Sequence, residues 1–211
     1  MAAAGVLDDT QKRRLAELTA GYRPLPGVAD EFIGPDGSPR PHWLRFLEPL
    51  SRTHPDDIDR AFSVADRNIA DSGASYRVPG EAADRPWPLG KLPMLIGAEE
   101  WREIAAGVAQ RASLLEAILS DVYGEGRLVA EGALPAALVA GSPDYLRPMQ
   151  GVKPPGGRWL NFYAVDLGRG PDGRWWVLGD RAQAPSGAGY ALVNRIVLSR
   201  AFLQREGIDL F

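Results

Sequence analysis

Apolar residues recur every three or four positions in several segments, which is the spacing of one face of an α-helix. The clearest case is residues 98–122, where this stripe predicts a long helix that ends before Gly124. Its core-facing side chains are expected to be Trp101, Ile104, Val108, Leu115, Leu119 and Val122. Shorter helices are predicted over 9–20, from Pro41, from His54-Pro55 and over 190–205.

The last third of the chain has a different pattern. Residues 158–167 and 174–180 are rich in aromatic and β-branched residues and predict two strands. Asp172-Gly173 lies between them and is a strong hairpin signal. Because a two-stranded hairpin is marginally stable alone, a strand from the extended, proline-punctuated residues 75–96 is expected to pair with it.

Composition narrows the class of protein. With 211 residues, 45% of them hydrophobic, the chain can bury a core and is not wholly disordered. A net charge of −3 argues against a general nucleic-acid or anionic-membrane binder. No run approaches the 18 or so apolar residues of a membrane span. The absence of cysteine and of a signal-peptide pattern at the start predicts a cytoplasmic location.

The candidate chemistry lies in 159–195, which reads strand, hairpin, strand, small-residue loop, helix. A two-residue turn at Asp172-Gly173 places Asp166 opposite Gly179, whereas a three-residue loop centred on Gly173 places it opposite Asp180. Opposed carboxylates with Cβ atoms roughly 5 Å apart repel unless a cation lies between them, and Mg²⁺ suits such a pair. The alternative is two solvated residues at strand ends.

The loop before the last helix is rich in small residues. Ser186, Gly187 and Gly189 allow backbone N–H groups to approach a phosphate at a helix N-terminus. Arg195, after Asn194 in the first turns of that helix, can hold an oxygen of a phosphate or a carboxylate. The alternatives are an ordinary N-cap at Ser186 and a structural salt bridge at Arg195. Neither a Walker A motif nor a Rossmann fingerprint is present.

These segments resemble a known family. The resemblance covers about residues 21–211 and is most specific in 172–192, which contains DGRWWVLGDRAQAPSGAGYAL. Supporting stretches are Gly21–Val28, Arg40–Trp43, Arg85–Leu89, Gln110–Ala112 and Asp121–Gly124. The chain is similar to the circularly permuted type 2 ATP-grasp proteins, which are related to glutathionylspermidine synthase-like ligases.

The resemblance implies an ATP-dependent carboxylate–amine ligase that acts through an acyl phosphate, with ATP and Mg²⁺ as cofactors. It implies an α/β, ATP-grasp-like fold with a mixed sheet and flanking helices. Asp166 matches the first metal-binding acid of such enzymes, and Asp180 and Gln183 stand nearest to the others. Asn194 and Arg195 match an Asn-Arg pair of the family. In relatives a Glu comes directly before this pair, where this chain has Val193.

The resemblance also suggests an organisation and partners. We expect a leader helix in 1–20, a helix-rich region in 21–150 and the site-bearing unit in 151–211. Expected partners are small-molecule or peptide carboxylate and amine substrates, and a missing C-terminal half or partner chain that completes the nucleotide site. The alternative function is a non-catalytic structural or partner-binding module with an incomplete nucleotide site.

Overall fold

The computed structural model describes residues 9–90 and 93–202. The ends of the expected segments 1–20, 190–205 and 151–211 therefore lie partly outside the described residues. The helices and strands are α1 (Asp9–Thr19), α2 (Pro41–Arg52), α3 (Pro55–Asp71), β1 (Ser75–Tyr76), β2 (Arg85–Pro86), α4 (Ala98–Val122), α5 (Arg127–Ala130), α6 (Ala136–Ala140), β3 (Ala164–Arg169), β4 (Trp175–Arg181) and α7 (Gly187–Phe202). Short 3₁₀ turns occupy Arg147–Met149 and Pro155–Gly157.

The described residues divide into two compact units. The first contains those up to Gly97, Arg169–Arg174 and those from Ser186 onward, and the second contains Ala98–Gly168 and Trp175–Pro185. The units interleave along the sequence, whereas the three expected regions are consecutive. Those three regions remain a prediction.

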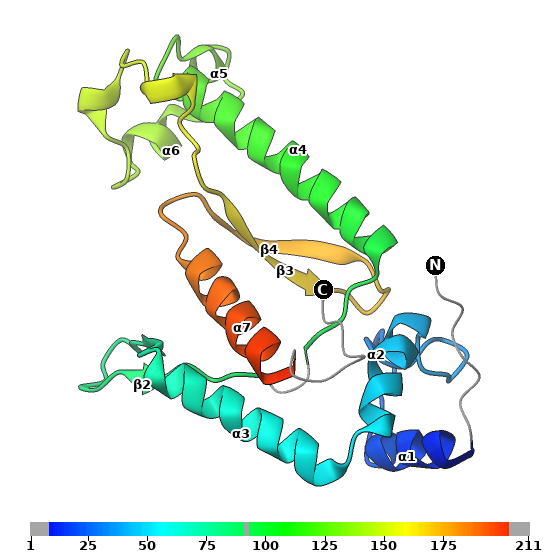
Figure 1. The fold of residues 1–211 in the computed structure, drawn as a ribbon. Helices are drawn as coiled ribbons and strands as arrows, with labels where there is room; N and C mark the ends of the chain where they lie inside the picture. The colour runs from blue at the N-terminus through cyan, green and yellow to red at the C-terminus, as the bar shows by residue number, and fades with distance from the viewer. Residues whose placement is uncertain (1–8, 91–92, 203–211) are drawn as a thin grey trace. The chain divides into compact units, whose positions relative to one another are not determined.

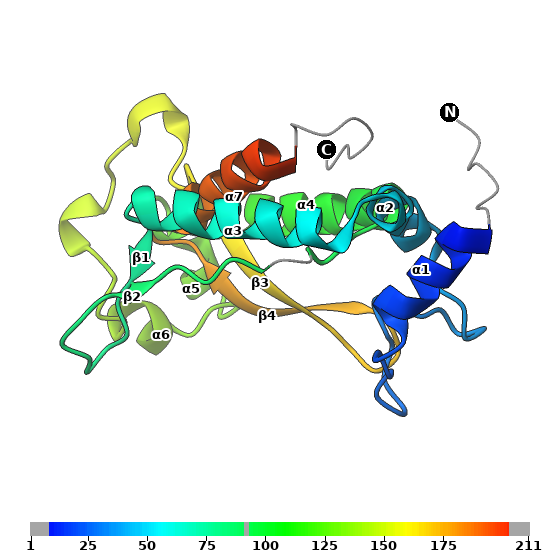
Figure 2. The same cartoon turned by 60° about the horizontal axis from the view of Figure 1, so that its bottom comes forward.

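The first unit carries the hydrophobic core. Its helices pack in pairs, α1 on α2 and α3 on α7, and Figures 1 and 2 show α3 and α7 side by side. Most of the buried apolar side chains come from α2, α3 and α7: Phe32, Leu47, Leu50, Ala61, Phe62, Ala65, Ile69 and Val197. The predicted helix starts at Pro41 and at His54-Pro55 are confirmed. His54 serves as the N-cap, because its Nδ1 accepts the backbone N–H of Asp56 at 3.3 Å.

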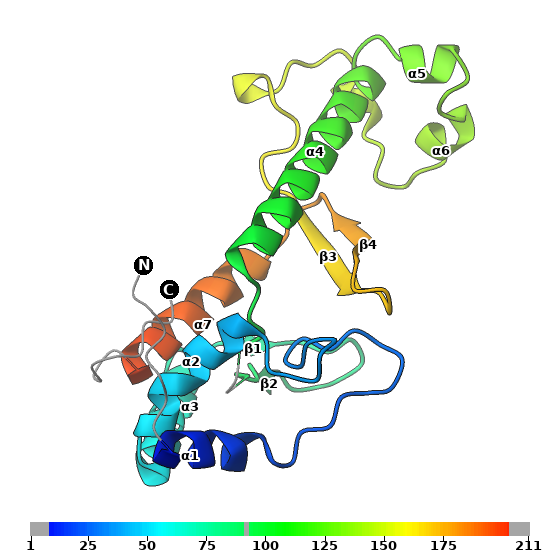
Figure 3. The same ribbon diagram turned by 90° about the vertical axis from the view of Figure 1, so that its right-hand side faces the viewer.

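The second unit is built around α4, which spans the predicted range 98–122. Figure 3 shows this helix beside the β3–β4 hairpin, with α5 and α6 near its C-terminal end. Ile104 is the one buried hydrophobic residue in this unit among the described residues. The expectation that Trp101 lies in the core is wrong, since it is 56% exposed. Helical periodicity defines a shared face, but burial requires a neighbour to cover that face.

Two small sheets replace the expected larger one. β1 pairs with β2 in antiparallel register, Ser75 with Pro86 and Tyr76 with Arg85, and β3 pairs with β4. The expectation that a strand from 75–96 joins the hairpin is therefore wrong for the described residues. Pro79, Pro86 and Pro88 lack the N–H group that a longer ladder needs. Helices and small sheets together confirm the α/β class, while the mixed sheet is not formed here.

Candidate functional site

The hairpin turn is neither of the two turns that the sequence left open. The Gly170 N–H donates to the Arg174 carbonyl at 2.8 Å, and the Gly173 N–H donates to the Gly170 carbonyl at 2.9 Å. The loop therefore consists of Pro171–Gly173, one residue earlier than a loop centred on Gly173. Gly173 has φ +79°, which is the left-handed position that favours glycine at the end of such a loop.

Asp166 lies on one face of the hairpin with Arg181. Nε and Nη2 of Arg181 donate to Asp166 Oδ2 at 3.0 and 2.8 Å. A Cβ placed on Gly179 would lie 3.6 Å from the same oxygen. Gly179 and Arg181 are two positions apart on β4, so strand alternation puts both on the face of Asp166. Because Gly179 has no Cβ, the carboxylate has room beside it.

Asp180 lies between Gly179 and Arg181 and therefore faces the other way, toward α4. Arg111 binds it at two points, Nε to Oδ1 and Nη2 to Oδ2, each at 2.7 Å. The Tyr163 hydroxyl also donates to Oδ1. The hydrogen bonds from Arg111 and then from Tyr163 lower the pKa of Asp180 to about 2. Asp180 is a fixed anion with a guanidinium already in place.

As placed, these two carboxylates do not fit one shared magnesium ion. They face opposite sides of β4, and each is neutralised by an arginine. Among the described residues, no group of three or more histidines and carboxylates is close enough to hold a metal. Gln183 lies in the exposed loop after β4. The predicted metal ligands belong to the second unit and the predicted phosphate ligands to the first.

The loop that follows β4 is strained where it approaches α7. Ala184 has φ +41°, the one positive value at a non-glycine position in the described chain. Side chains with a Cβ rarely adopt this conformation, and it tends to persist at functional sites. Ser186, which the sequence placed beside the helix, lies directly before the first residue of α7. Its carbonyl accepts the Gly189 N–H at 3.2 Å.

The first turn of α7 is open. A Cβ at Gly187 or Gly189 would meet nothing within 4 Å. The first N–H groups of a helix have no partner inside the helix, and the dipole favours an anion there. This end of α7 thus has space and helix-terminal donors for an anion such as a phosphate.

Asn194 has a packing role inside the first unit. Its Oδ1 accepts the indole N–H of Trp87 at 2.7 Å. Trp87 stacks on Tyr190 with ring centroids 4.2 Å apart, and the Tyr190 hydroxyl donates to the Ser75 carbonyl at 2.8 Å. The β1–β2 segment is therefore fastened to α7. Arg195, the next residue, is exposed.

Val193 explains one departure from the family pattern. The family resemblance leads us to expect a glutamate at this position, but the valine side chain packs against the hydrophobic core. Valine at this position supplies apolar contact and no charge.

Sequence reasoning missed the side chains that hold the predicted site residues and the strand that carries one of them. Arg111 and Trp87 both lie in stretches that carry the family resemblance, and this was the available signal. Tyr163 and Glu116 gave no such signal. Glu116 on α4 accepts the backbone N–H groups of Trp159 and Leu160, at 3.0 and 2.7 Å, and so anchors the segment that leads into β3.

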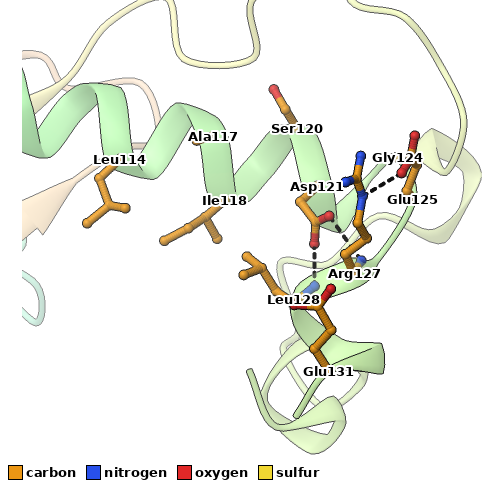
Figure 4. Close-up of a pocket in the computed structure, with 10 residues that line it drawn as sticks. All are labelled: Leu114, Ala117, Ile118, Ser120, Asp121, Gly124, Glu125, Arg127, Leu128 and Glu131. Atoms are coloured by element: carbon orange, nitrogen blue, oxygen red, sulfur yellow. Dashed lines mark hydrogen bonds and ion pairs between the residues drawn. The ribbon is translucent and has the colours of Figure 1, made fainter. Parts of the chain in front are cut away.

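A cavity of about 710 Å³ lies where α4 ends and α5 begins (Figure 4). Leu114 and Ile118 from α4 and Leu128 from α5 form its apolar wall. Asp121 caps α5 by accepting the backbone N–H groups of Arg127 and Leu128 at 3.0 and 2.9 Å. The cavity contains none of the predicted site residues.

No described helix is long and apolar enough to cross a membrane. The chain is 36% identical to an uncharacterized protein of Mycobacterium tuberculosis over 199 residues, covering 89% of this chain and 22% of that protein. It is 36% identical over 172 residues to a Frankia alni protein named "Putative glutamate--cysteine ligase 2-3", and this match covers 81% of this chain and 20% of that protein. An uncharacterized Synechocystis protein is 31% identical over 175 residues, which cover 82% of this chain and 36% of that protein.

These relatives are much longer than the region they share with this chain, which spans 19% to 36% of the matched relatives' length. Residues 93–206 match the family described as circularly permuted ATP-grasp type 2. The matched range includes α4, the β3–β4 hairpin, the strained loop and the described part of α7. On this match, which covers more than half of the sequence, the chain belongs to the circularly permuted ATP-grasp type 2 family.

Proposed function

We propose that this chain is part of an ATP-dependent ligase that joins a carboxylate to an amine through an acyl phosphate. The observation that carries the proposal is the family match over 93–206, which contains the whole strand–turn–strand–loop–helix segment. Two Frankia relatives, each with a name that begins "Putative glutamate--cysteine ligase", support the same reaction class. The open glycines at the start of α7 supply a surface on which a phosphate can lie.

In this proposal Ser186 and Gly187 present backbone N–H groups to the nucleotide phosphates, and Gly189, whose own N–H is donated to the Ser186 carbonyl, leaves room for them. Arg195 neutralises charge on a transferring phosphate or carboxylate, which is the main requirement of phosphoryl transfer. Asn194 contacts the nucleotide through its amide N–H groups, because its oxygen is held by Trp87.

Magnesium binding by Asp166, Asp180 and Gln183 stays a prediction. It requires both carboxylates to exchange their arginine partners for the ion. A further polypeptide, either a continuation of the chain or a partner, completes the nucleotide site and brings the carboxylate and amine substrates. The substrates and this completion are part of the proposal.

The alternative is a structural or partner-binding module without catalysis. Two observations favour it: Val193 packs against the core at a position where the family resemblance implies glutamate, and Asp166 and Asp180 are both engaged by arginines. In that case the hairpin and α7 keep the family fold without its cofactor.

Thermal unfolding with and without nucleotide separates the two proposals. A ligand bound to the folded state stabilises it by about 2.7 kcal/mol at 100 times its Kd. ATP alone, Mg²⁺ alone and both together are compared for the wild type and for Arg195→Gln, Asp166→Ala and Asp180→Ala. Arg200→Gln, an exposed arginine on the same helix, is the matched control.

The ligase proposal expects MgATP to raise the melting temperature of the wild type and of Arg200→Gln. Arg195→Gln should reduce that shift. If both aspartate variants also abolish the increment that Mg²⁺ adds to ATP, the predicted metal ligands are supported. A cooperatively folded wild type without any nucleotide-dependent shift contradicts nucleotide binding by this segment and favours the alternative.

A further inference from the structure

A second cavity, of about 670 Å³, lies within the first unit. Its walls are the loop from Pro24 to Gly37 and the hairpin turn, with Arg40 and Arg169 contributing side chains. Its volume is in the range of small-molecule sites, about 300–1,000 Å³. No residue proposed for ATP or magnesium lines it.

Arg40 provides the unusual chemistry of this cavity. The residue is half-buried, and its Nε donates to the Asp30 carbonyl at 3.0 Å, which fixes the plane of the guanidinium. Its two terminal nitrogens form no hydrogen bond or ion pair with any acceptor in residues 9–90 and 93–202. A half-buried guanidinium in this state is a prepared receptor for a planar or tetrahedral anion.

The acidic groups near Arg40 are already engaged. The carboxylate of Asp30 accepts the backbone N–H groups of Phe32 and Ile33 at 2.8 and 2.6 Å and the hydroxyl of Tyr22 at 2.5 Å. Asp172 is held by Nε of Arg174 at 2.5 Å. None of these carboxylates forms an ion pair with Arg40, although its positive charge helps to lower the pKa of Asp30 from a greater distance. The charge of Arg40 is therefore not neutralised by direct contact.

The second arginine of the cavity is fixed as part of the wall. Arg169 forms a two-point ion pair with Glu31 and donates to the Gly173 carbonyl at 2.9 Å. Its side chain is only 12% exposed. The hairpin turn is thereby attached to the loop beside Arg40. A wall that exists before the ligand arrives lowers the entropy cost of binding.

We propose that this cavity binds a small molecule through a carboxylate or phosphate group, which pairs with the two terminal nitrogens of Arg40. The site goes beyond the proposed nucleotide function, because its anion would bind to Arg40, whereas the nucleotide phosphates would bind to the start of α7. Carboxylate and phosphate share the geometry that a guanidinium recognises at two points, so the probes must distinguish them.

The test titrates the intact 211-residue chain with inorganic phosphate and, separately, with succinate. Ionic strength is held constant with sodium chloride, and binding is followed by calorimetry and by melting temperature. Arg40→Gln removes the receptor. Arg45→Gln, an exposed arginine on α2, is the matched control. Val28→Trp partly fills the cavity without changing its charge, and since Val28 is 45% exposed, the fold should tolerate it.

The proposal expects saturable binding of at least one probe by the wild type and by Arg45→Gln. Arg40→Gln and Val28→Trp should each weaken it at least tenfold, and Arg40→Lys should retain part of it. A response to phosphate alone assigns a phosphate ligand, and a response to succinate alone assigns a carboxylate ligand.

Three results overturn the proposal. The first is no saturable binding of either probe by the folded wild type. The second is equal binding by wild type and Arg40→Gln, which indicates general screening of charge. The third is a loss of phosphate binding in Arg195→Gln but not in Arg40→Gln. That result places the anion at α7, so it supports the proposed function while it removes this site.

Discussion

Arg111 and Asp180 are joined at two points, Nε to Oδ1 and Nη2 to Oδ2, both at 2.7 Å, although 69 residues separate them in the sequence. The pair connects α4 to the end of β4. Two parallel N–H···O bonds fix orientation as well as distance. The carboxylate expected from the sequence to bind a metal therefore has a structural partner.

Protonation of Asp180 should weaken the folded state. Its folded pKa, about 2, is below the ordinary value of about 3.9 for an unfolded aspartate. The unfolded state therefore binds the proton first, and the stabilisation is complete above about pH 4 and is lost as the pH falls toward about 2. Urea unfolding between pH 2.5 and 5 should show a steeper loss for wild type than for Asp180→Asn.

Asp144→Asn, at an exposed position of the same unit, is the control for that experiment. Its stability should follow the wild-type pH dependence. Parallel curves for wild type and Asp180→Asn would show that the pair with Arg111 does not lower the pKa of this carboxyl.

Glu116→Gln should loosen the entry into β3. Burial raises the pKa of Glu116, but hydrogen bonds from the Trp159 and Leu160 N–H groups outweigh it and leave the pKa lowered. Loss of the charge should reduce the free energy of unfolding by about 1 kcal/mol. Chemical denaturation measures it, with Glu103→Gln, exposed on the same helix, expected to change little. Equal effects of the two variants would refute the anchoring role.

Asn194→Leu should destabilise the first unit, because the indole N–H of Trp87 loses its acceptor. An unsatisfied, partly buried donor costs about 1 kcal/mol or more. The melting temperature should fall and the tryptophan emission should change. Asn161→Leu, at an exposed position, should have neither effect. If Asn194→Leu changed neither the melting temperature nor the emission, the stacking of Trp87 on Tyr190 would be sufficient to hold the indole in place.

Ala184→Gly should stabilise the protein. A left-handed conformation costs a residue with a Cβ roughly 1–2 kcal/mol, and glycine avoids this at an entropy cost of about 0.5–1 kcal/mol. The net gain is expected to be about 0.5 kcal/mol in thermal unfolding. The contrasting control, Ala188→Gly in the first turns of α7, should lower the stability, because glycine is a poorer helix former than alanine. Destabilisation by both glycines would argue that Ala184 is unstrained.

Glu31→Gln should break the ion pair that attaches the hairpin turn. The side chains of Arg169 and Glu31 are 12% and 30% exposed, so Arg169 would keep a largely buried charge without its counter-ion. We expect a loss of about 1–3 kcal/mol in denaturant unfolding. Arg52→Gln breaks a pair whose arginine is 57% exposed and should cost about 0.5 kcal/mol or less. A similar cost for both would contradict the role of burial.

The sequence by itself determined the elements whose signals are local. The helix at 98–122 follows from its apolar periodicity, and the starts of α2 and α3 follow from proline at the first helical position. The strands around Asp172-Gly173 follow from turn chemistry, although β3 begins at Ala164, well after the predicted start at 158. The family resemblance also came from linear motifs.

The tertiary structure alone decided which side chains meet. Arg111 binds Asp180 from another element, and Trp87 donates to Asn194, which is 107 residues away in the sequence. β1 pairs with β2 and not with the hairpin. Asp166 and Asp180 lie on opposite faces of the hairpin and bind different arginines, Arg181 and Arg111, which a turn signal does not specify. Periodicity and turn signals act over a few residues, whereas an ion pair or a strand pairing depends on where distant segments pack.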